Sequence, residues 1–388
     1  MDKNFIIIMQ KICIIGDGMS GLIAAAILGQ ENIKIDLYSS KEKKIKSKKD
    51  NRTTAISENN YKYLLNKFNL QSSKFFWPSK EVNLFYENDN QIKNFLNLKE
   101  QNENLMYIFK NNQFIRIINR VILKNKKIKI VKKKIDKVDF SNGSILVKKQ
   151  KFNYDLIVLC TGINSDLYKK ITINRNIEKN YKEVAITTTI KHRSDIKNAR
   201  QYFLNEGPLA ILPFSNNSFS VVWSIDATFF DENYKIIRNV LKSKIQTILE
   251  KIKISSIDNI HSYPLYLNLK TNYFKKNVLI LGDGLHTVHP MAGQGFNLVI
   301  RDVKKLSELI SRTVKLGILI SNSNILKDFF NSRKPENNIL GLGVNLTNMF
   351  FKNNKYFSPF RNILLENVKN FDFVKKLSKQ ISNKGISI

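Results

Sequence analysis

The chain has 388 residues, 43% of them hydrophobic, which is enough to build the cores of two or three domain-sized units and excludes a disordered chain. No apolar run reaches the length that spans a bilayer, and the only two cysteines, Cys13 and Cys160, lie in apolar segments, which argues against a disulfide framework. The net charge of +32 comes from lysines spread along the whole chain without a nucleic-acid-binding motif. It indicates a solvated lysine-rich surface or an anionic partner surface.

The first predicted element, residues 11–28 ("KICIIGDGMSGLIAAAIL"), is a buried strand, a glycine-rich turn and a helix. With a second strand at 33–40 it forms a βαβ unit, the context in which such a turn binds a dinucleotide. Gly16 would allow the tight turn, Gly18 the approach of a pyrophosphate, and Gly21 close packing of helix on strand. A glycine turn that binds nothing is the alternative.

The end of the second strand is where such folds usually carry an acid for the ribose. Ser39 or Ser40 occupies that place here. A serine can still donate and accept hydrogen bonds, but it brings no charge.

The elements that follow alternate between helical and strand patterns. Residues 41–60 are basic and polar and are expected to be a loop. Helices are expected at 61–70, 113–123, 232–252 and 295–314, and strands at 79–98, 127–149 (with a turn at 141–144), 154–162 and 277–284. Residues 176–270 are rich in strand patterns, with a hairpin turn at 215–218. The fold class is therefore α/β, with one nucleotide-binding domain split in sequence by a β-rich insertion.

Two later segments indicate a longer cofactor than a nicotinamide dinucleotide. They are "DNRTTAIS" at 50–57 and "LILGDGLHTVHPMAGQGFNLVIRD" at 279–302. Asp283 would bind sugar-chain hydroxyls, and the helix after Gly295 would face a negatively charged ring. FAD, with a ribityl chain and an isoalloxazine ring, needs such a second clamp.

With these segments the chain resembles the FAD-dependent aromatic hydroxylases of the para-hydroxybenzoate hydroxylase type, and among them the ubiquinone-biosynthesis monooxygenases. "GDGMSG", "DNRTTAIS", "GPLAILPF…VVWSI" and "GDGLHTVHPMAGQGFNLVIRD" follow the family's order and spacing along nearly the whole chain. The resemblance implies a Rossmann-like FAD-binding domain of the glutathione-reductase βαβ type at 9–75, 100–175 and 275–345. It also implies a β-rich substrate domain at 76–99 and 176–274, and a C-terminal helical region at 346–388.

The resemblance also assigns cofactor-binding residues. Gly16, Gly18 and Gly21 would bind the pyrophosphate, Arg52 would lie by the flavin and its diphosphate, and Asp283 would bind the ribityl chain. The other cofactor contacts expected are Ser39, Asn111, Pro290, Gly293, Gln294, Gly295 and Asn297. Thr161 and Tyr168 replace an Asp and an Arg of a motif associated with the response to NAD(P)H. The reductant is therefore either NAD(P)H or a protein electron donor.

Several residues keep two interpretations. His286 and His289 stand three apart, but no further ligand cluster accompanies them, and we expect no metal site. We expect them to pack in a loop beside the flavin, with His289 an alternative partner for a phenolic substrate. Phe214 and Trp223 are sheet or core residues, or else they line the substrate. Asp302 is expected on a helix surface or in packing.

The implied reaction is hydroxylation of a polyprenylated phenol on the route to ubiquinone, with dioxygen, through a flavin hydroperoxide. No protein nucleophile is needed. The tail at 345–381 alternates aromatic and basic residues, so it would lie on an anionic bilayer, dock on other quinone-biosynthesis enzymes, or cap the FAD domain. We expect a cytoplasmic protein, peripheral on the inner membrane in the membrane-bound case, and no nucleic-acid partner.

Two alternative functions stay open. One is an FAD-dependent hydroxylase or reductase of another substrate. The other is a degenerate flavoprotein that acts as an assembly subunit of a quinone-biosynthesis complex.

Overall fold

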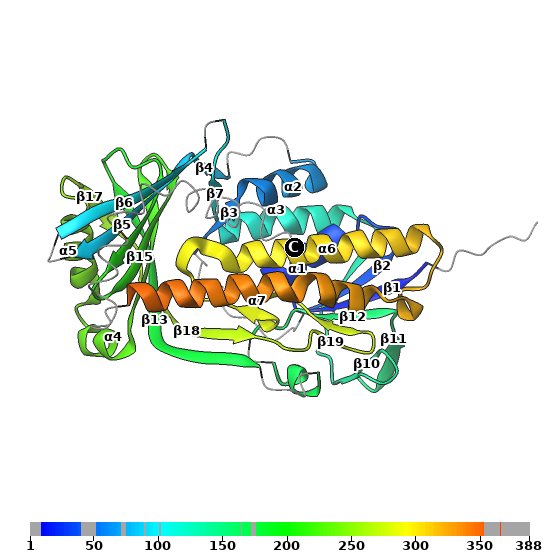
Figure 1. Cartoon of the computed structure of the whole chain (residues 1–388). Helices are drawn as coiled ribbons and strands as arrows, with labels where there is room; N and C mark the ends of the chain where they lie inside the picture. Colours follow the sequence, from blue (N-terminus) through cyan, green and yellow to red (C-terminus); the bar gives the residue numbers. More distant parts are fainter. Residues whose placement is uncertain are drawn as a thin grey trace, which may run out of the picture.

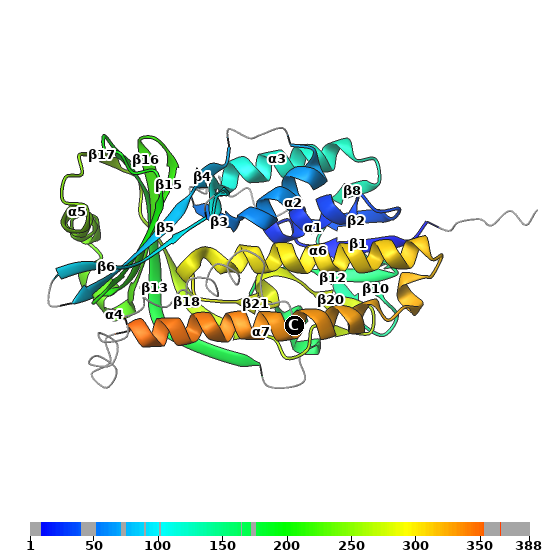
Figure 2. The same ribbon diagram turned by 45° about the horizontal axis from the view of Figure 1, so that its top comes forward.

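The computed structural model describes residues 9–39, 52–70, 75–88, 91–100, 102–163, 165–171, 176–352 and Leu365. A half built of helices around a small parallel sheet lies beside a half dominated by one large sheet (Figure 1). Helix α7 (Ile325–Phe351) runs along both halves, as the turned view also shows (Figure 2). The mixed α/β class expected from the sequence is confirmed.

The first half is organised around a six-stranded sheet of order β19-β20-β12-β1-β2-β8. Its strands are β1 (Lys11–Ile15), β2 (Lys34–Tyr38), β8 (Ile128–Val131), β12 (Leu156–Leu159), β19 (Phe274–Lys275) and β20 (Val278–Ile280). All neighbours pair in parallel except β19 with β20. The strands β1 and β12 are almost entirely buried and apolar, as expected for a parallel sheet covered on both faces.

Helix α1 (Met19–Leu28) packs against α3 (Asn111–Lys124) and α6 (Gln294–Lys315). The predicted βαβ unit is thus confirmed, with the glycine turn between β1 and α1. Two three-stranded sheets and one helix complete this half: β3 (Thr53–Ser57), β4 (Trp77–Ser79) and β7 (Met106–Lys110); β9 (Lys137–Asp139), β10 (Ser144–Val147) and β11 (Gln150–Asn153); α2 (Glu58–Phe68).

The second half is a nine-stranded sheet of order β21-β18-β13-β16-β15-β14-β5-β6, with β17 also paired to β13. Its strands are β5 (Glu81–Asn88), β6 (Gln91–Lys99), β13 (Ile177–His192), β14 (Ala199–Leu204), β15 (Gly207–Ser215), β16 (Ser218–Asp226), β17 (Ile254–Ile257), β18 (His261–Leu269) and β21 (His286–Thr287). One face packs its large apolar side chains against α4 (Ala227–Asn233) and α5 (Ile237–Ile248). On the other face, Ala185 and Val222 contact Leu298 of α6 and Leu340 of α7, so this face turns toward the first half.

Most predicted elements are found, and two expectations are wrong. Residues 41–60 are not all loop, because Thr53–Ser57 form β3, whose edge pairs with β7. The single helix expected at 232–252 is split into α4 and α5, because the Asn233 side chain donates to the Phe229 carbonyl and closes the last turn of α4.

We propose the domain division expected from the sequence with two changes. Strand β4, inside 76–99, pairs with β7 in the first half, and β21, inside 275–345, joins the nine-stranded sheet. Of the region 346–388, only 346–352 and Leu365 are described, so its predicted helical cap lies mainly outside the described residues. Within the described ranges, no helix combines the length and apolarity needed to cross a membrane.

Candidate cofactor site

A cavity of about 750 Å³ opens at the carboxyl ends of β1 and β2. This is where open α/β sheets bind their ligands. Of the expected cofactor contacts, the cavity wall includes Gly16, Gly18, Ser39, Arg52, Asn111, Asp283 and Gly295. The structure thus brings together residues from six separate parts of the sequence.

The three glycines of the first turn have different structural roles. Gly16 has φ +114°, and a Cβ there would lie 2.2 Å from the Cys160 carbonyl oxygen, so the turn requires glycine. A Cβ at Gly18 would meet nothing within 4 Å and would point into open space at the cavity. A Cβ at Gly21 would lie 1.9 Å from the Gly16 carbonyl oxygen. Gly21 therefore allows the helix to pack closely on the strand. It does not line the cavity, so the structure does not support its expected contact with a pyrophosphate.

Two helices begin at this cavity without a capping side chain. Gly18 is the N-cap of α1, and Gly293, in the left-handed region at φ +61°, is the N-cap of α6. Gly295 and Phe296, in the first turn of α6, belong to the cavity wall. Uncapped N–H groups and the positive end of the helix dipole favour an anion, so the cavity offers two such places.

Three polar side chains of the cavity come from the residue before β3, the start of α3 and the turn after β20. The Arg52 guanidinium stacks 5.0 Å from the centroid of the Tyr263 ring. The Asn111 amide oxygen accepts from the Thr54 hydroxyl at 2.7 Å, which orients that buried side chain beside Arg52. Asp283 is exposed in the turn after β20, and its carboxylate is available to a ligand.

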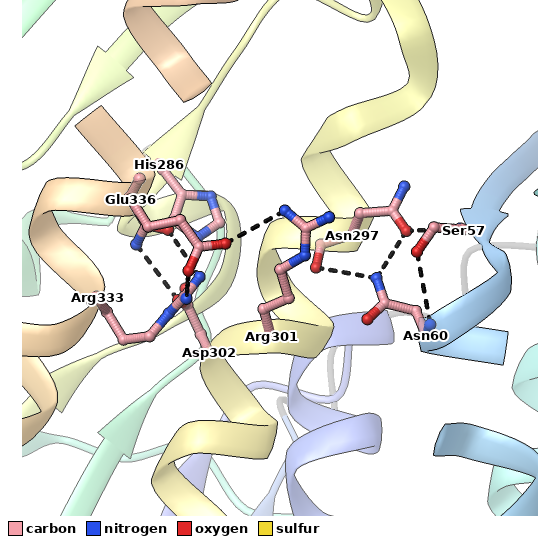
Figure 3. A network of polar contacts seen from close by, with 9 residues as sticks. Ser57, Asn60, His286, Asn297, Arg301, Asp302, Arg333 and Glu336 are labelled. Atoms are coloured by element: carbon pink, nitrogen blue, oxygen red, sulfur yellow. Dashed lines mark hydrogen bonds and ion pairs between the residues drawn. The ribbon is translucent and has the colours of Figure 1, made fainter. Parts of the chain in front are cut away.

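The cavity wall does not include four other expected contacts, Pro290, Gly293, Gln294 and Asn297. Asn297 has a clear structural role instead. Its amide oxygen accepts from the Ser57 N–H at 2.9 Å and from Asn60 at 2.7 Å (Figure 3). Its amide nitrogen donates to the carbonyl oxygens of Gly293 and Ala55. Asn297 thus positions the start of α6 against β3, and its amide has no group left for the cofactor.

His289 is fully buried, and both of its ring nitrogens have partners. Nδ1 accepts from the Met291 N–H at 3.3 Å, so the proton lies on Nε2, which donates to Glu183 at 3.1 Å. The structure therefore does not support His289 as the partner of a phenol. It makes His289 a link between the loop before α6 and β13.

The two aromatic residues considered for the substrate lie apart. Trp223 is fully buried in the core between the large sheet and its two helices, so of its two interpretations the structure supports the core residue and not the substrate contact. Phe214 is half-buried at the end of β15, and the Lys110 ammonium lies 4.3 Å from the centroid of its ring. Lys110 directly precedes Asn111, which keeps Phe214 near the cavity as a candidate.

Asp302 is not a surface residue but the centre of a buried ionic network that sequence reasoning missed (Figure 3). It accepts from His286 Nε2 at 2.6 Å and from Arg333 Nε at 2.6 Å, and Glu336 connects Arg333 to Arg301. Burial would raise the pKa of Asp302, but the charges of Arg333 and His286 outweigh it and hold the pKa below its usual range. Nothing in the local pattern around Arg333 indicates this pairing.

The comparisons with known proteins agree with this geometry. Residues 144–315 match the family model described as an FAD binding domain. The mitochondrial ubiquinone biosynthesis monooxygenase COQ6 of Dictyostelium discoideum is 30% identical over 288 residues, which cover 62% of this chain and 57% of that protein. The 3-demethoxyubiquinol 3-hydroxylase of Escherichia coli is 29% identical over 161 residues, 40% of each chain. The chain therefore spans less than two thirds of the length of these relatives.

The solved structure of p-nitrophenol 4-monooxygenase PnpA from Pseudomonas putida has a TM-score of 0.77 at 15% identity, over 98% of this chain and 99% of that one, and shows the shared fold. The chain is thus similar in sequence and in fold to FAD-dependent aromatic hydroxylases.

FAD is the cofactor, and the cavity fits it. Open space at Gly18 and Gly295 lets a ligand reach the backbone of both uncapped helix ends. The charged side chains of the cavity suit two parts of FAD. Arg52 suits the diphosphate, and Asp283 suits the hydroxyl groups of the ribityl chain.

Thr161 and Tyr168, which the resemblance identifies as replacements in one motif, are in direct contact. The Tyr168 hydroxyl accepts from the Thr161 N–H at 3.2 Å and from the Thr161 hydroxyl at 2.9 Å. The Tyr168 ring fills the space beside Gly284, where a Cβ would lie 2.2 Å from its hydroxyl oxygen. The replacements therefore form a packed unit next to Asp283.

Proposed function

We propose that this chain is an FAD-dependent monooxygenase that hydroxylates the aromatic ring of a polyprenylated phenol in ubiquinone biosynthesis. The observation that carries the proposal is the uncapped start of α6 at the cavity, with Gly295 open to a ligand, in a fold shared with FAD-dependent monooxygenases. The names of the curated relatives support the pathway and the phenolic substrate.

Each part of the site has a role in this reaction. When bound, reduced FAD supplies the electrons and activates dioxygen for attack on the ring. The N–H groups at the start of α6 stabilise negative charge on the ring system of the cofactor, and Asn297 holds that helix end in place. The start of α1 and Arg52 bind the diphosphate, and Asp283 binds the ribityl hydroxyls.

An apolar cluster beside the loop before α6 supports an apolar substrate. It joins the edge of the large sheet to Met291, two residues before Gly293. Its buried members are Tyr86, Phe95, Leu96, Leu98, Leu105, Phe203, Met291 and Leu365. We propose that this cluster borders the substrate region, where its apolar side chains would exclude water and suit a prenyl chain better than a polar group.

The reductant and the location in the cell are part of the proposal. Because Tyr168 and Thr161 occupy each other's hydrogen-bonding groups, we propose slow reduction by NAD(P)H alone and a protein electron donor in the cell. A membrane-dissolved substrate calls for a peripheral protein at an anionic membrane surface, where other quinone-biosynthesis enzymes would be neighbours.

The test is to delete the gene and to determine by mass spectrometry which quinone precursor accumulates. A prenylated precursor that lacks one ring hydroxyl supports the proposal, and restoration of ubiquinone by the intact gene links the defect to this chain. An unchanged quinone content contradicts it.

A degenerate flavoprotein that acts as an assembly subunit is the second candidate. It is favoured by the serine in place of the ribose-binding acid and by the Thr161–Tyr168 pair. A purified chain that stays colourless after incubation with excess FAD, yet restores ubiquinone, would establish this alternative.

A further inference from the structure

The outward face of the second half of α7 carries an apolar stripe, defined by Ile339, Leu342, Leu346 and Met349. Their side chains are 44%, 38%, 63% and 46% exposed. The spacings of three, four and three residues place them within an arc of about 80° on one side of the helix. From 337 to 351 the helix has no charged residue, in a chain in which 25% of residues are charged.

The opposite face of the same helix segment is firmly packed. Val344 and Phe351 contact the apolar cluster that contains Met291, and Leu340 packs with Leu298 and Ala185. The stripe is therefore presented by a helix that the core holds in place. On the inner side, this helix reaches the wall of the proposed substrate region.

Basic side chains border the stripe. Lys179 is exposed on β13 and donates to the Asn345 side chain of α7 at 3.4 Å. Lys352, at the end of the helix, is 55% exposed and pairs with Glu183 at 2.6 Å. The nearby acid Glu178 is paired with Lys270 at 3.5 Å. Lys352 and Lys270 are each paired with one of these acids, so Lys179 supplies the excess positive charge at the border, in a molecule of net charge +32.

We propose that the apolar stripe of α7 docks on an anionic phospholipid bilayer. Apolar side chains on one helix face with lysines beside them are the arrangement that lies in a membrane interface. Two copies joined through this face would bring together two positive borders and two chains of net charge +32, which disfavours a dimer. The inference rests on the proposed function, since a membrane-dissolved substrate would enter beside the helix that touches the bilayer.

The test is co-sedimentation of the full-length FAD-loaded protein with vesicles of phosphatidylcholine alone or mixed with phosphatidylglycerol. We expect binding to the mixed vesicles, weaker binding to the neutral ones, and loss of binding at high salt. The double variant Leu342→Gln/Leu346→Gln should bind the mixed vesicles at least about tenfold more weakly, because two leucine side chains are no longer available to insert into the bilayer. The matched control is Leu316→Gln/Leu319→Gln, which changes two exposed leucines in the connection between α6 and α7 and should bind like wild type.

Equal binding by the stripe variant and wild type, or no binding of wild type to the mixed vesicles, overturns the inference. The inference is also overturned if wild type sediments as a dimer and the stripe variant as a monomer. The stripe would then bind a second copy of the chain. Hydroxylation of a short-chain phenol in solution is measured in parallel. Its absence with normal vesicle binding would count against the proposed function and not against the docking surface.

Discussion

Gly21 and Gly295 lie in the first turns of α1 and α6, but a side chain would have different effects at the two positions. A Cβ at Gly295 meets no atom within 4 Å, whereas a Cβ at Gly21 lies 1.9 Å from a backbone oxygen. Gly295→Val should therefore fold like wild type but lose hydroxylation, because the side chain fills the place of the flavin. Thermal melting of the apoprotein, FAD content and product yield are the measurements.

Gly21→Ala is the matched comparison for that prediction. This substitution should lower the melting temperature or prevent folding, because the added Cβ would collide with the carbonyl oxygen of Gly16 in the turn after β1. Full activity of Gly295→Val would show that the start of α6 is not where the flavin ring binds.

Asp283 should contribute to FAD affinity without contributing to the fold. The side chain is exposed at the cavity, and hydrogen bonds to a charged acceptor contribute about 1.5–3 kcal/mol. Asp283→Ala should weaken FAD binding about 10- to 150-fold, measured by fluorescence titration of the apoprotein. Asp166→Ala is the control, because that exposed carboxylate pairs with Lys169 outside the cavity wall.

The Thr161–Tyr168 contact leads to a kinetic prediction. We expect slow flavin reduction by NADH or NADPH under anaerobic conditions in a stopped-flow instrument. Bleaching at about 10 per second or faster, a typical turnover rate, would contradict it and would show that the two replacements do not matter.

At the scale of elements, α6 and α7 are joined by the network around Asp302. Because the folded state holds the pKa of Asp302 below its usual range, its contribution to stability is complete above the unfolded value of about 3.9. That contribution is lost as pH falls through the lower folded value.

Asp302→Asn should lower the free energy of unfolding by about 3–5 kcal/mol at pH 7, since Arg333 stays buried without its main partner. Its stability should also fall less steeply than that of wild type below about pH 4. Denaturant titrations at several pH values measure both effects. Asp231→Asn, on the exposed side of α4, should behave like wild type.

Local patterns predicted these elements well where one turn or one helix face decides the structure. The βαβ unit, α2, α3, α6 and the 215–218 turn are examples. The split between α4 and α5 was missed because it depends on an amide that closes a helix turn. Asn297, His289 and Asp302 were misjudged because their partners come from β3, β13 and α7, which no local pattern connects.

At the scale of the whole molecule, the cavity is built from segments between residues 15 and 296. A ligand that binds only the folded state stabilises all of these segments together, by about 2.7 kcal/mol at a concentration of 100 times Kd. Saturating FAD should therefore raise the melting temperature by several degrees. For Gly295→Val the rise should be smaller, as scanning calorimetry with and without FAD would show. An equal rise for both would place the ring of the cofactor elsewhere.

The position of β20 in the first sheet has a consequence for synthesis on the ribosome. Val278–Ile280 pair with Ile157–Leu159, and the whole of β13 to β18 is translated between the two strands. Until β20 emerges, one edge of β12 has no neighbour, while the large sheet can already complete most of its pairing. A nascent chain stalled before residue 278 would therefore present an apolar strand edge, a natural binding site for a chaperone. FAD can therefore bind only late in synthesis, when the first sheet is complete, and its binding would then stabilise that sheet.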